Sequence, residues 1–270
     1  MLRSLRHSFR LYFSMVSFSI RAQLEYPYAF VMNILGWAMN YAGTAITMWV
    51  LLFSFQTIQG WTFWELLFLF ALSVLSWGLC IIFFFHFRSL DQYILNGTFD
   101  RFLIRPIHPF MHFMASKFDV GAFGHLLFSI MAFVLAYSQL NLSWSLVQWL
   151  IFLAALLGGV LIQGGILIFI SALAFWTTRS ESFYWVIMFP AANLLNYPLS
   201  IYPKGFQWTI TFILPYAFIN YLPALLLLGK ADSSYPSALG LLSLPAGIVF
   251  FAICVRLWLQ GLSHYKSTGS

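Results

Sequence analysis

The stretch RSLDQYILNGTFDRFLIRPIHPFMHFMASK, from Arg88 to Lys117, is the longest polar interruption in a sequence that is otherwise almost continuously apolar. It contains four of the 13 basic residues and two of the seven acidic ones. The segments on either side have the composition of membrane-spanning helices. We therefore expect this stretch to be the place where a membrane-embedded body meets a partner in the cytoplasm.

The composition of the whole chain supports a membrane-embedded body. Of its 270 residues, 61% are hydrophobic and 7% are charged, whereas about 25% are charged in soluble domains. The apolar runs are far longer than the alternating segments, ~10 residues long, of a membrane β-barrel. We expect an all-α polytopic membrane protein with one domain, residues 1–270. The net charge of +6 indicates a basic cytoplasmic rim rather than a nucleic-acid partner.

The first 25 residues carry arginines on one side of a regular apolar pattern. Leu2, Leu5, Phe9 and Phe13 recur at helical spacing, and Arg10 lies on the other side. This pattern favours an amphipathic helix lying in the membrane interface over residues 1–25, rather than a disordered basic tail. It lacks the compact apolar core and small-residue cleavage site of a secretory signal.

Seven apolar runs follow, each bounded by turns or charges. Most are long enough for the ~20 residues that a bilayer core requires. Their approximate bounds are Ala29–Phe53, Leu66–Phe87, Val120–Leu140, Trp144–Thr178, Phe183–Tyr202, Gly205–Gly229 and Pro236–Val255.

The distribution of basic residues decides how many of these runs cross the membrane. Seven crossings would place Arg256 and Lys266 outside the cell, against the positive-inside rule. If residues 205–229 instead enter and return on one face, broken at Pro215 and Pro223, six spans remain. Eleven of the 13 basic residues then lie in the cytoplasm. We therefore expect six transmembrane helices, cytoplasmic termini, and a re-entrant helical hairpin between spans five and six.

No catalytic or metal-binding motif is present in the sequence. HExxH, GxSxG and clustered carboxylates are all missing, as is the Walker A motif that binds nucleotide phosphates. His125, inside the third span, is either a proton-relay residue or, as we favour, a neutral histidine bonded to a neighbouring helix. Both cysteines, Cys80 and Cys254, lie in apolar runs and indicate neither a disulfide nor a metal site. We expect no enzymatic activity and no bound cofactor in this chain.

The membrane segments contain a few amides in place of charges. Gln163 lies in the fourth span, and Asn193 and Asn196 lie three residues apart in the fifth, which would put them on one helix face. Such amides either hydrogen-bond between helices, which we favour, or line a substrate route.

Four segments carry a family resemblance. The chain resembles the integral membrane permease subunits of bacterial type-2 ABC exporters in layout: a basic interfacial helix, six spans, a helical loop after the second, and a proline-broken segment before the last. The segments are LDQYILNGTFDRFLIRPIHPF (Leu90–Phe110), NYPLSIYP (Asn196–Pro203), LPYAFINYLPALLLLG (Leu214–Gly229) and the ending GLSHYKSTGS.

The resemblance implies a mechanism and partners. Two permease subunits, identical or different, would pair around a translocation path in the bacterial inner membrane, in contact with lipids. Each would dock a separate ATPase subunit that uses ATP and Mg²⁺. The path residues expected on this basis are Gln163, Asn193, Asn196, Tyr197, Pro215, Tyr221 and Pro223.

The polar stretch has the features of an ATPase-coupling loop, spanning residues 88–117. A short helix ending at Asn96-Gly97 would present an apolar face to a groove on the partner. The alternative is a solvated basic loop on lipid headgroups, but the apolar side chains would then be exposed. The expected coupling residues are Leu90, Asp91, Tyr93, Ile94, Leu95, Asp100, Arg101 and Arg105.

Two other functions remain open from the sequence. One is a membrane enzyme acting on lipid-linked substrates, for which His108, His112 and Asp119 come nearest to a polar cluster at the interface. The other is a membrane scaffold without transport. A path lined by aromatic and amide side chains would suit an amphipathic drug, a lipid or a glycan equally well.

Overall fold

The computed structural model describes residues 25, 27–105, 108–116, 119, 121–177 and 179–265. These residues form a bundle of helices, with no β-strand among them beyond one isolated bridge between Ile58 and Trp61. The all-helical, multi-pass class expected from composition is confirmed. The expected interfacial helix lies, apart from Glu25, outside the described residues, as do Lys117 and the last five residues of the tail.

Among the described residues, five helices are long and apolar enough to cross a bilayer, or six spans if one bent helix pair counts as a span. Their apolar lengths explain why they form, because a helix satisfies its backbone polar groups internally at membrane depth. The five are α2 (Pro27–Phe55), α3 (Phe63–Phe84), α7 (Ala122–Gln139), α8 (Leu146–Thr177) and α12 (Ser243–His264).

The fifth predicted span is shorter than expected. Helix α9 (Glu181–Leu194) has 14 residues, and at ~1.5 Å per residue it is about 21 Å long, below the ~30 Å of a bilayer core. The prediction that this helix continues to Tyr202 is wrong. Pro198 explains the early end, because it has no N–H to donate and disfavours helical geometry in the residue before it. A 3₁₀ turn, η2 (Leu199–Ile201), follows.

The bent pair lies where the re-entrant hairpin was expected. Its first arm is α10 (Lys204–Trp208) with the π-helical turn η3 (Thr209–Ile213), and its second arm is η4 (Tyr216–Phe218) with α11 (Tyr221–Leu227). The arms meet at 75°. Buried Pro215 stands at the bend, where its missing N–H interrupts helical hydrogen bonding. We refer to residues 204–227 as the hairpin.

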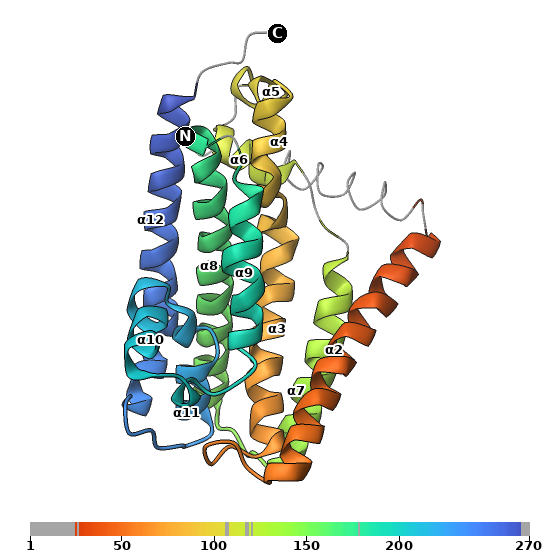
Figure 1. Ribbon diagram of the computed structural model, residues 1–270, viewed down its shortest axis with the longest axis vertical. Helices are drawn as coiled ribbons and strands as arrows, with labels where there is room; N and C mark the ends of the chain where they lie inside the picture. Colours follow the sequence, from red (N-terminus) through yellow and green to blue (C-terminus); the bar gives the residue numbers. More distant parts are fainter. Residues whose placement is uncertain are drawn as a thin grey trace.

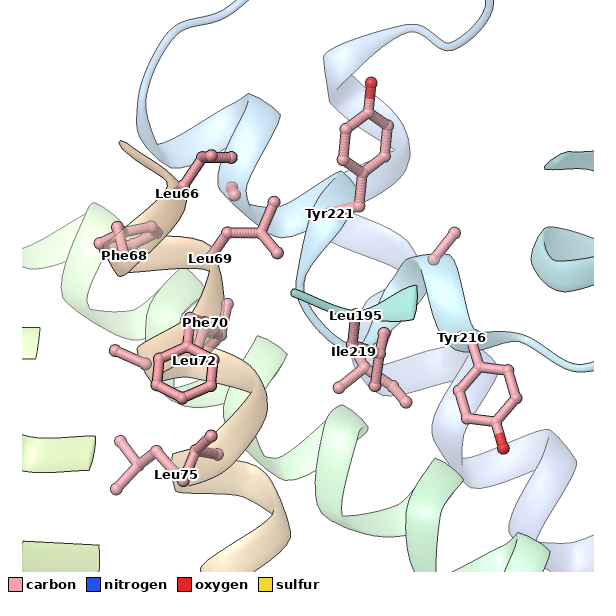
Figure 2. Close-up of a cluster of buried hydrophobic side chains, with 14 of the residues drawn as sticks. Leu66, Phe68, Leu69, Phe70, Leu72, Leu75, Leu195, Tyr216, Ile219 and Tyr221 are labelled. Atoms are coloured by element: carbon pink, nitrogen blue, oxygen red, sulfur yellow. The ribbon is translucent and has the colours of Figure 1, made fainter. Parts of the chain in front are cut away.

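Helix α3 is the central helix of the bundle. It packs against α7 and α8, and most of its side chains are buried. Figure 2 shows Leu66, Leu69 and Leu72 of α3 near Tyr221 and Ile219 of the hairpin. A helix covered on all sides is apolar all round, as α3 is. In contrast, α2 packs mainly on α7 and leaves much of its apolar surface exposed.

Helices α8 and α12 approach closely through glycines. A Cβ atom on Gly247 would lie 2.7 Å from the carbonyl oxygen of Gly158, and one on Gly158 would collide with the backbone of Ser243. Small residues that let helix backbones meet are the usual basis of helix packing in membranes, where lipid competes with apolar side chains.

The bundle has two chemically different ends (Figure 1). The loop end carries α4 (Leu90–Leu95), α5 (Asp100–Leu103), α6 (Pro109–Ala115), the start of α9 and the end of α12. The hairpin end carries the turn between α2 and α3, the hairpin, and η5 (Ser237–Leu242). Figure 1 shows α4 to α6 at the top and α10 and α11 in the lower part.

Candidate functional site

The short helix that the sequence predicts at the start of the loop is present, but its apolar face points inward. The 3₁₀ turn η1 (Phe85–Ser89) leads into α4, and Gly97, with a φ of 63°, ends the turn that follows it. Leu90 is fully buried and Ile94 is 4% exposed. Both belong to a buried cluster that includes Trp258 of α12. The expectation that these two side chains would be exposed without a partner is wrong, because α4 packs against α8 of the same chain.

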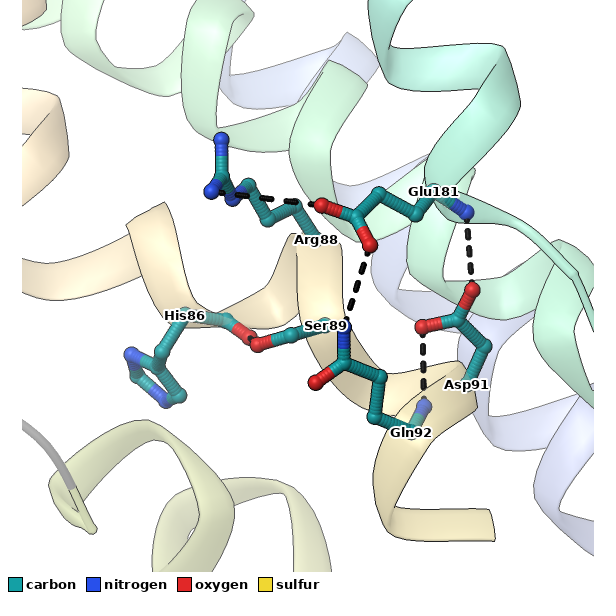
Figure 3. A network of polar contacts seen from close by, with 6 residues as sticks. All are labelled: His86, Arg88, Ser89, Asp91, Gln92 and Glu181. Atoms are coloured by element: carbon teal, nitrogen blue, oxygen red, sulfur yellow. Dashed lines mark hydrogen bonds and ion pairs between the residues drawn. The ribbon is translucent and has the colours of Figure 1, made fainter. Parts of the chain in front are cut away.

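Asp91 joins the loop to the start of α9 (Figure 3). Its Oδ2 atom accepts a 2.9 Å hydrogen bond from the backbone N–H of Glu181, and its Oδ1 atom accepts one of 2.8 Å from that of Gln92. The side chain is 5% exposed. A carboxylate at this position satisfies a free N–H of the first helical turn and lies at the positive end of the helix dipole. The contact therefore fixes α9 to α4.

Glu181 and Arg88 complete this junction. The Glu181 carboxylate accepts a 3.1 Å hydrogen bond from Gln92 and lies 3.9 Å from the Arg88 guanidinium. The guanidinium also lies 4.5 Å from the ring centre of Phe85 and 5.2 Å from that of Tyr184. Cation–π contacts of this kind hold an arginine in place at an interface. Sequence pattern predicts Arg88 only as a basic residue of the loop, because its neighbours Tyr184 and Trp185 are almost 100 positions away in the chain.

A second contact joins the loop to the end of α12. The Tyr265 hydroxyl donates a 2.8 Å hydrogen bond to Asp100. Burial, together with this bond and the charge of Asp100, raises the pKa of Tyr265 to about 12. Asp100, predicted to pair with a partner chain, thus already has a partner within this one. The Arg101 Nε donates to the Thr98 carbonyl at 3.3 Å.

The exposed apolar side chains of the loop are not Leu90 and Ile94, which were predicted to form its contact face. Leu95 is 55% exposed, Leu103 is 39% exposed and Ile104 is 81% exposed. Backbone N–H groups of residues 98 and 99 donate to the Tyr93 carbonyl, so the start of α5 lies next to the end of α4. Leu103 and Ile104 were missed, although their alternation with buried Phe99 and Phe102 is a helical signal. We define the tip patch as Leu95, Arg101, Leu103, Ile104 and Arg105, all exposed.

The amides expected along a path occupy different environments. Gln163 is 2% exposed and donates a 2.7 Å hydrogen bond to the Ser76 hydroxyl, which joins α8 to α3. Asn193 is exposed, whereas Asn196 lies half-buried in the turn beyond α9. The prediction that these two asparagines share one helix face is wrong, since the helix ends at Leu194.

The remaining path candidates concentrate in and before the hairpin. Tyr221 and Pro223 are buried in α11, Pro215 is buried at the bend, and Tyr197 is half-buried in the turn before η2. The Tyr221 hydroxyl donates to Asp232. The hairpin thus gathers three candidates in one element, while Gln163 lies in a helix interface.

Two polar contacts that sequence reasoning missed hold the hairpin in place. The Asn220 amide donates to the carbonyl of Leu195 at 2.6 Å and to that of Leu69 in α3 at 3.2 Å. Lys230 donates to Glu65 at 2.7 Å and to the carbonyl of Gly60 at 2.8 Å. A polar residue within an apolar run, as Asn220 is, was the available signal for the first contact.

The other polar candidates occupy different environments. Tyr41 of α2 hydrogen-bonds to His125, as favoured for a histidine bonded to a neighbouring helix. His108 is exposed, whereas His112 is buried and lies 3.5 Å from the Arg105 guanidinium. Among the described residues, no group of three His, Cys, Asp or Glu side chains is placed to hold a metal ion. Cys80 and Cys254 are buried free thiols.

The comparison with protein families gives one match. The family described as "ABC-2 family transporter protein" matches residues 38–269, which include the loop, α9, the hairpin and α12. No curated protein and no solved structure matches the chain.

Proposed function

Because the chain belongs to the ABC-2 family of transporter proteins, and is thus a multi-pass membrane component of an ABC transporter, we propose that it is the permease subunit of an ATP-driven exporter. In this proposal the chain hydrolyses no ATP itself. A separate ATPase subunit binds ATP and Mg²⁺ and docks on the loop end. A second permease, identical or different, completes the translocation path.

The charge distribution supports a cytoplasmic loop end. Arg101, Arg105 and Arg179 are exposed there, while Lys204 and Lys230 lie at the hairpin end. Cytoplasmic loops carry the excess of basic residues in membrane proteins. On this basis both termini are cytoplasmic and the hairpin faces the outside of a bacterial inner membrane.

The tip patch supports docking at this end. Its apolar members, Leu95, Leu103 and Ile104, are flanked by Arg101 and Arg105. Exposed apolar side chains with basic neighbours suit a groove that has apolar walls and an acidic rim. This patch replaces Leu90 and Ile94 as the proposed contact surface, since those two side chains serve the core of the chain.

The observation that carries the proposal is the hydrogen bond from the Glu181 N–H to Asp91. It fixes α9 to α4, and the opposite end of α9 leads to Leu195, whose carbonyl accepts from Asn220 of the hairpin. Displacement of α4 by an ATPase would thus move α9 and pull on the hairpin. Tyr265 and Asp100 would carry the same displacement to α12.

The exposed face of α2 supports a second permease. Met32, Leu35 and Met39 are at least half exposed along this helix. Lipid or a paired subunit would cover them. We propose that the path forms between the two subunits and is lined by Asn193, Asn196, Tyr197 and the exposed first arm of the hairpin. Pro215, Tyr221 and Pro223 support it from within the chain, as Gln163 does from the α3–α8 interface.

The test is a double substitution in the tip patch, Leu95→Asp with Ile104→Asp, in the chain co-expressed with its ATPase. We expect loss of ATPase co-purification, because two carboxylates would have to be buried in the interface without partners. The matched control is Leu95→Met with Ile104→Val, which keeps both positions apolar and should retain the ATPase.

Normal ATPase recovery with a folded Leu95→Asp, Ile104→Asp double variant would refute docking at the tip patch. Folding is checked by the elution profile and melting temperature of the detergent-solubilised chain alone. Aspartate at Leu90 and Ile94 would not test docking, because it would place charges in the buried cluster.

A further inference from the structure

A polar pocket of about 220 Å³ lies at the loop end, between α3, α4 and the start of α9. Ile81 and Phe85 line it on the side of α3. The remaining lining is polar and includes Arg88, Asp119 and Glu181. The pocket thus has an apolar wall and a charged wall.

The pocket lies at the depth expected for lipid headgroups. The long apolar run that includes α3 ends at Phe85, the first residue of η1, and the charged loop begins at Arg88. Trp185, whose ring centre is 5.9 Å from the Arg88 guanidinium, is 53% exposed, and Val186 is 71% exposed. Exposed tryptophan beside exposed aliphatic residues is typical of the boundary between headgroups and acyl chains.

The charges of the pocket match a ligand that carries both signs. Arg88 provides one guanidinium, while Glu181 and Asp119 provide two carboxylates. The Arg88–Glu181 separation of 3.9 Å exceeds a hydrogen bond, so this contact leaves N–H donors of the guanidinium and lone pairs of the carboxylate for a third group. A phosphate suits the guanidinium, and a primary ammonium, with three N–H donors, suits a pair of carboxylates.

We propose that this pocket binds the headgroup of an ethanolamine phospholipid. Its phosphate faces Arg88, its ammonium donates to Glu181 and Asp119, and its acyl chains extend along the exposed side of α9. This goes beyond the proposed function and does not depend on it: a lipid would occupy the junction where α4 is fixed to α9, whatever docks on the tip patch.

The test uses the full chain purified in detergent, without an ATPase, and native mass spectrometry of bound lipid. Dioleoyl phosphatidylethanolamine, its N-methylated forms, phosphatidylcholine and phosphatidylglycerol are each titrated separately. We expect wild-type retention to fall with each added methyl group, on the order of tenfold from ethanolamine to choline, because charge-assisted N–H donors are lost.

Variants assign the effect to the pocket. Glu181→Gln keeps an acceptor for Gln92 but removes the charge, and it should reduce retention of the ethanolamine lipid to that of the choline lipid. Arg88→Gln should weaken retention of every phospholipid. Its matched control, Arg101→Gln, changes a basic residue of the tip patch outside the pocket and should leave the ethanolamine preference intact.

Two results would overturn the proposal. One is equal retention of the ethanolamine and choline lipids by the wild-type chain, which needs no variant to fold. The other is an ethanolamine preference that survives both Glu181→Gln and Asp119→Asn, since the preference would then arise elsewhere on the chain. Neither result bears on ATPase docking, which is measured in the absence of added lipid.

Discussion

The carboxylate of Asp91 accepts a hydrogen bond from the backbone amide of Glu181, the first residue of α9, across 2.9 Å. The two residues are 90 positions apart in the sequence and belong to the loop between α3 and α7 and to the short helix α9. The bond is partly buried, with Asp91 only 5% exposed, so the carboxylate has few competing water contacts. We infer that α4 and the start of α9 move as one body.

Removing the Asp91 carboxylate should uncouple the transporter without releasing the ATPase. Asp91→Ala leaves the partly buried N–H of Glu181 without its acceptor, at a cost of up to about 1–3 kcal/mol. We expect ATPase co-purification to persist while substrate transport per ATP hydrolysed falls. Asp91→Asn retains one acceptor oxygen and should have a milder effect. A fully coupled Asp91→Ala variant would contradict a mechanical role for this bond.

The glycine contact between α8 and α12 should be intolerant of any side chain. Gly158→Ala and Gly247→Ala each place a Cβ against backbone atoms of the other helix, which cannot move aside without separating the helices. Overpacking of this kind costs about 1–3 kcal/mol. The melting temperature in detergent measures it. Gly36→Ala in α2, where no atom lies within 4 Å of the added Cβ, is the matched control and should not be destabilising.

The sequence predicted five of the six spans, all but α9, because a bilayer imposes a length and a polarity that can be counted. It predicted the bend at Pro215 for a similar reason, since proline cannot donate a backbone hydrogen bond. The second predicted break is wrong, because Pro223 lies in the first turn of α11, where a missing N–H is tolerated. The sequence could not predict which face of α4 is buried. An amphipathic helix of six residues suits a partner and a core equally, and only the packing of α8 decides between them.

The sequence also could not predict the contacts between segments that lie far apart in the chain. Lys230 was counted only among the basic residues, and nothing in its spacing of 165 positions from Glu65 indicates that the two meet. The end of α9 was misplaced because an apolar run continues past it to Tyr202. An apolar run shows only that the residues are hydrophobic. The helix stops earlier, because Pro198 disfavours helical geometry in the residue before it. Asn193 and Asn196 were therefore predicted on one face of a helix that in fact ends between them, at Leu194.

Gln163 should contribute to stability rather than to substrate choice. It is buried and bonds to Ser76, so Gln163→Leu removes a helix-to-helix hydrogen bond worth about 0.6 kcal/mol on average in membranes. A double-mutant cycle with Ser76→Ala should show a coupling energy of that order in the free energy of unfolding. A change in substrate preference, measured by transport of competing substrates, would instead place Gln163 on the path.

The Lys230–Glu65 ion pair should stabilise the hairpin end of the bundle. Both side chains are less than one-fifth exposed, and Lys230 also lies 4.9 Å from the ring centre of Trp61. Lys230→Met or Glu65→Gln alone leaves a partly buried charge without its partner, so each should lower the melting temperature. The double variant removes both charges and should be more stable than Lys230→Met. A double variant that is less stable than either single one would contradict this.

His112 should make the loop end sensitive to acid. Burial, aided by the charge of Arg105 and opposed by a hydrogen bond with the backbone of Phe102, lowers its pKa from the ordinary 6.5. A guanidinium only donates, so the 3.5 Å contact between Arg105 and the Nε2 atom requires a neutral ring. Below pH 6.5 the unfolded chain binds a proton that the folded chain resists, and stability falls until the lowered pKa is reached.

The melting temperature of the wild-type chain should therefore drop more steeply than that of His112→Gln as the pH falls from about 7 to about 5.5. This range includes the ordinary histidine pKa. Glutamine can accept from Arg105 at every pH in this range and does not titrate. His264→Gln, at an exposed position near the end of α12, is the matched control and should follow the wild-type curve. If His112→Gln also follows that curve, the acid sensitivity belongs to other groups, and the Arg105–His112 contact does not stabilise the loop.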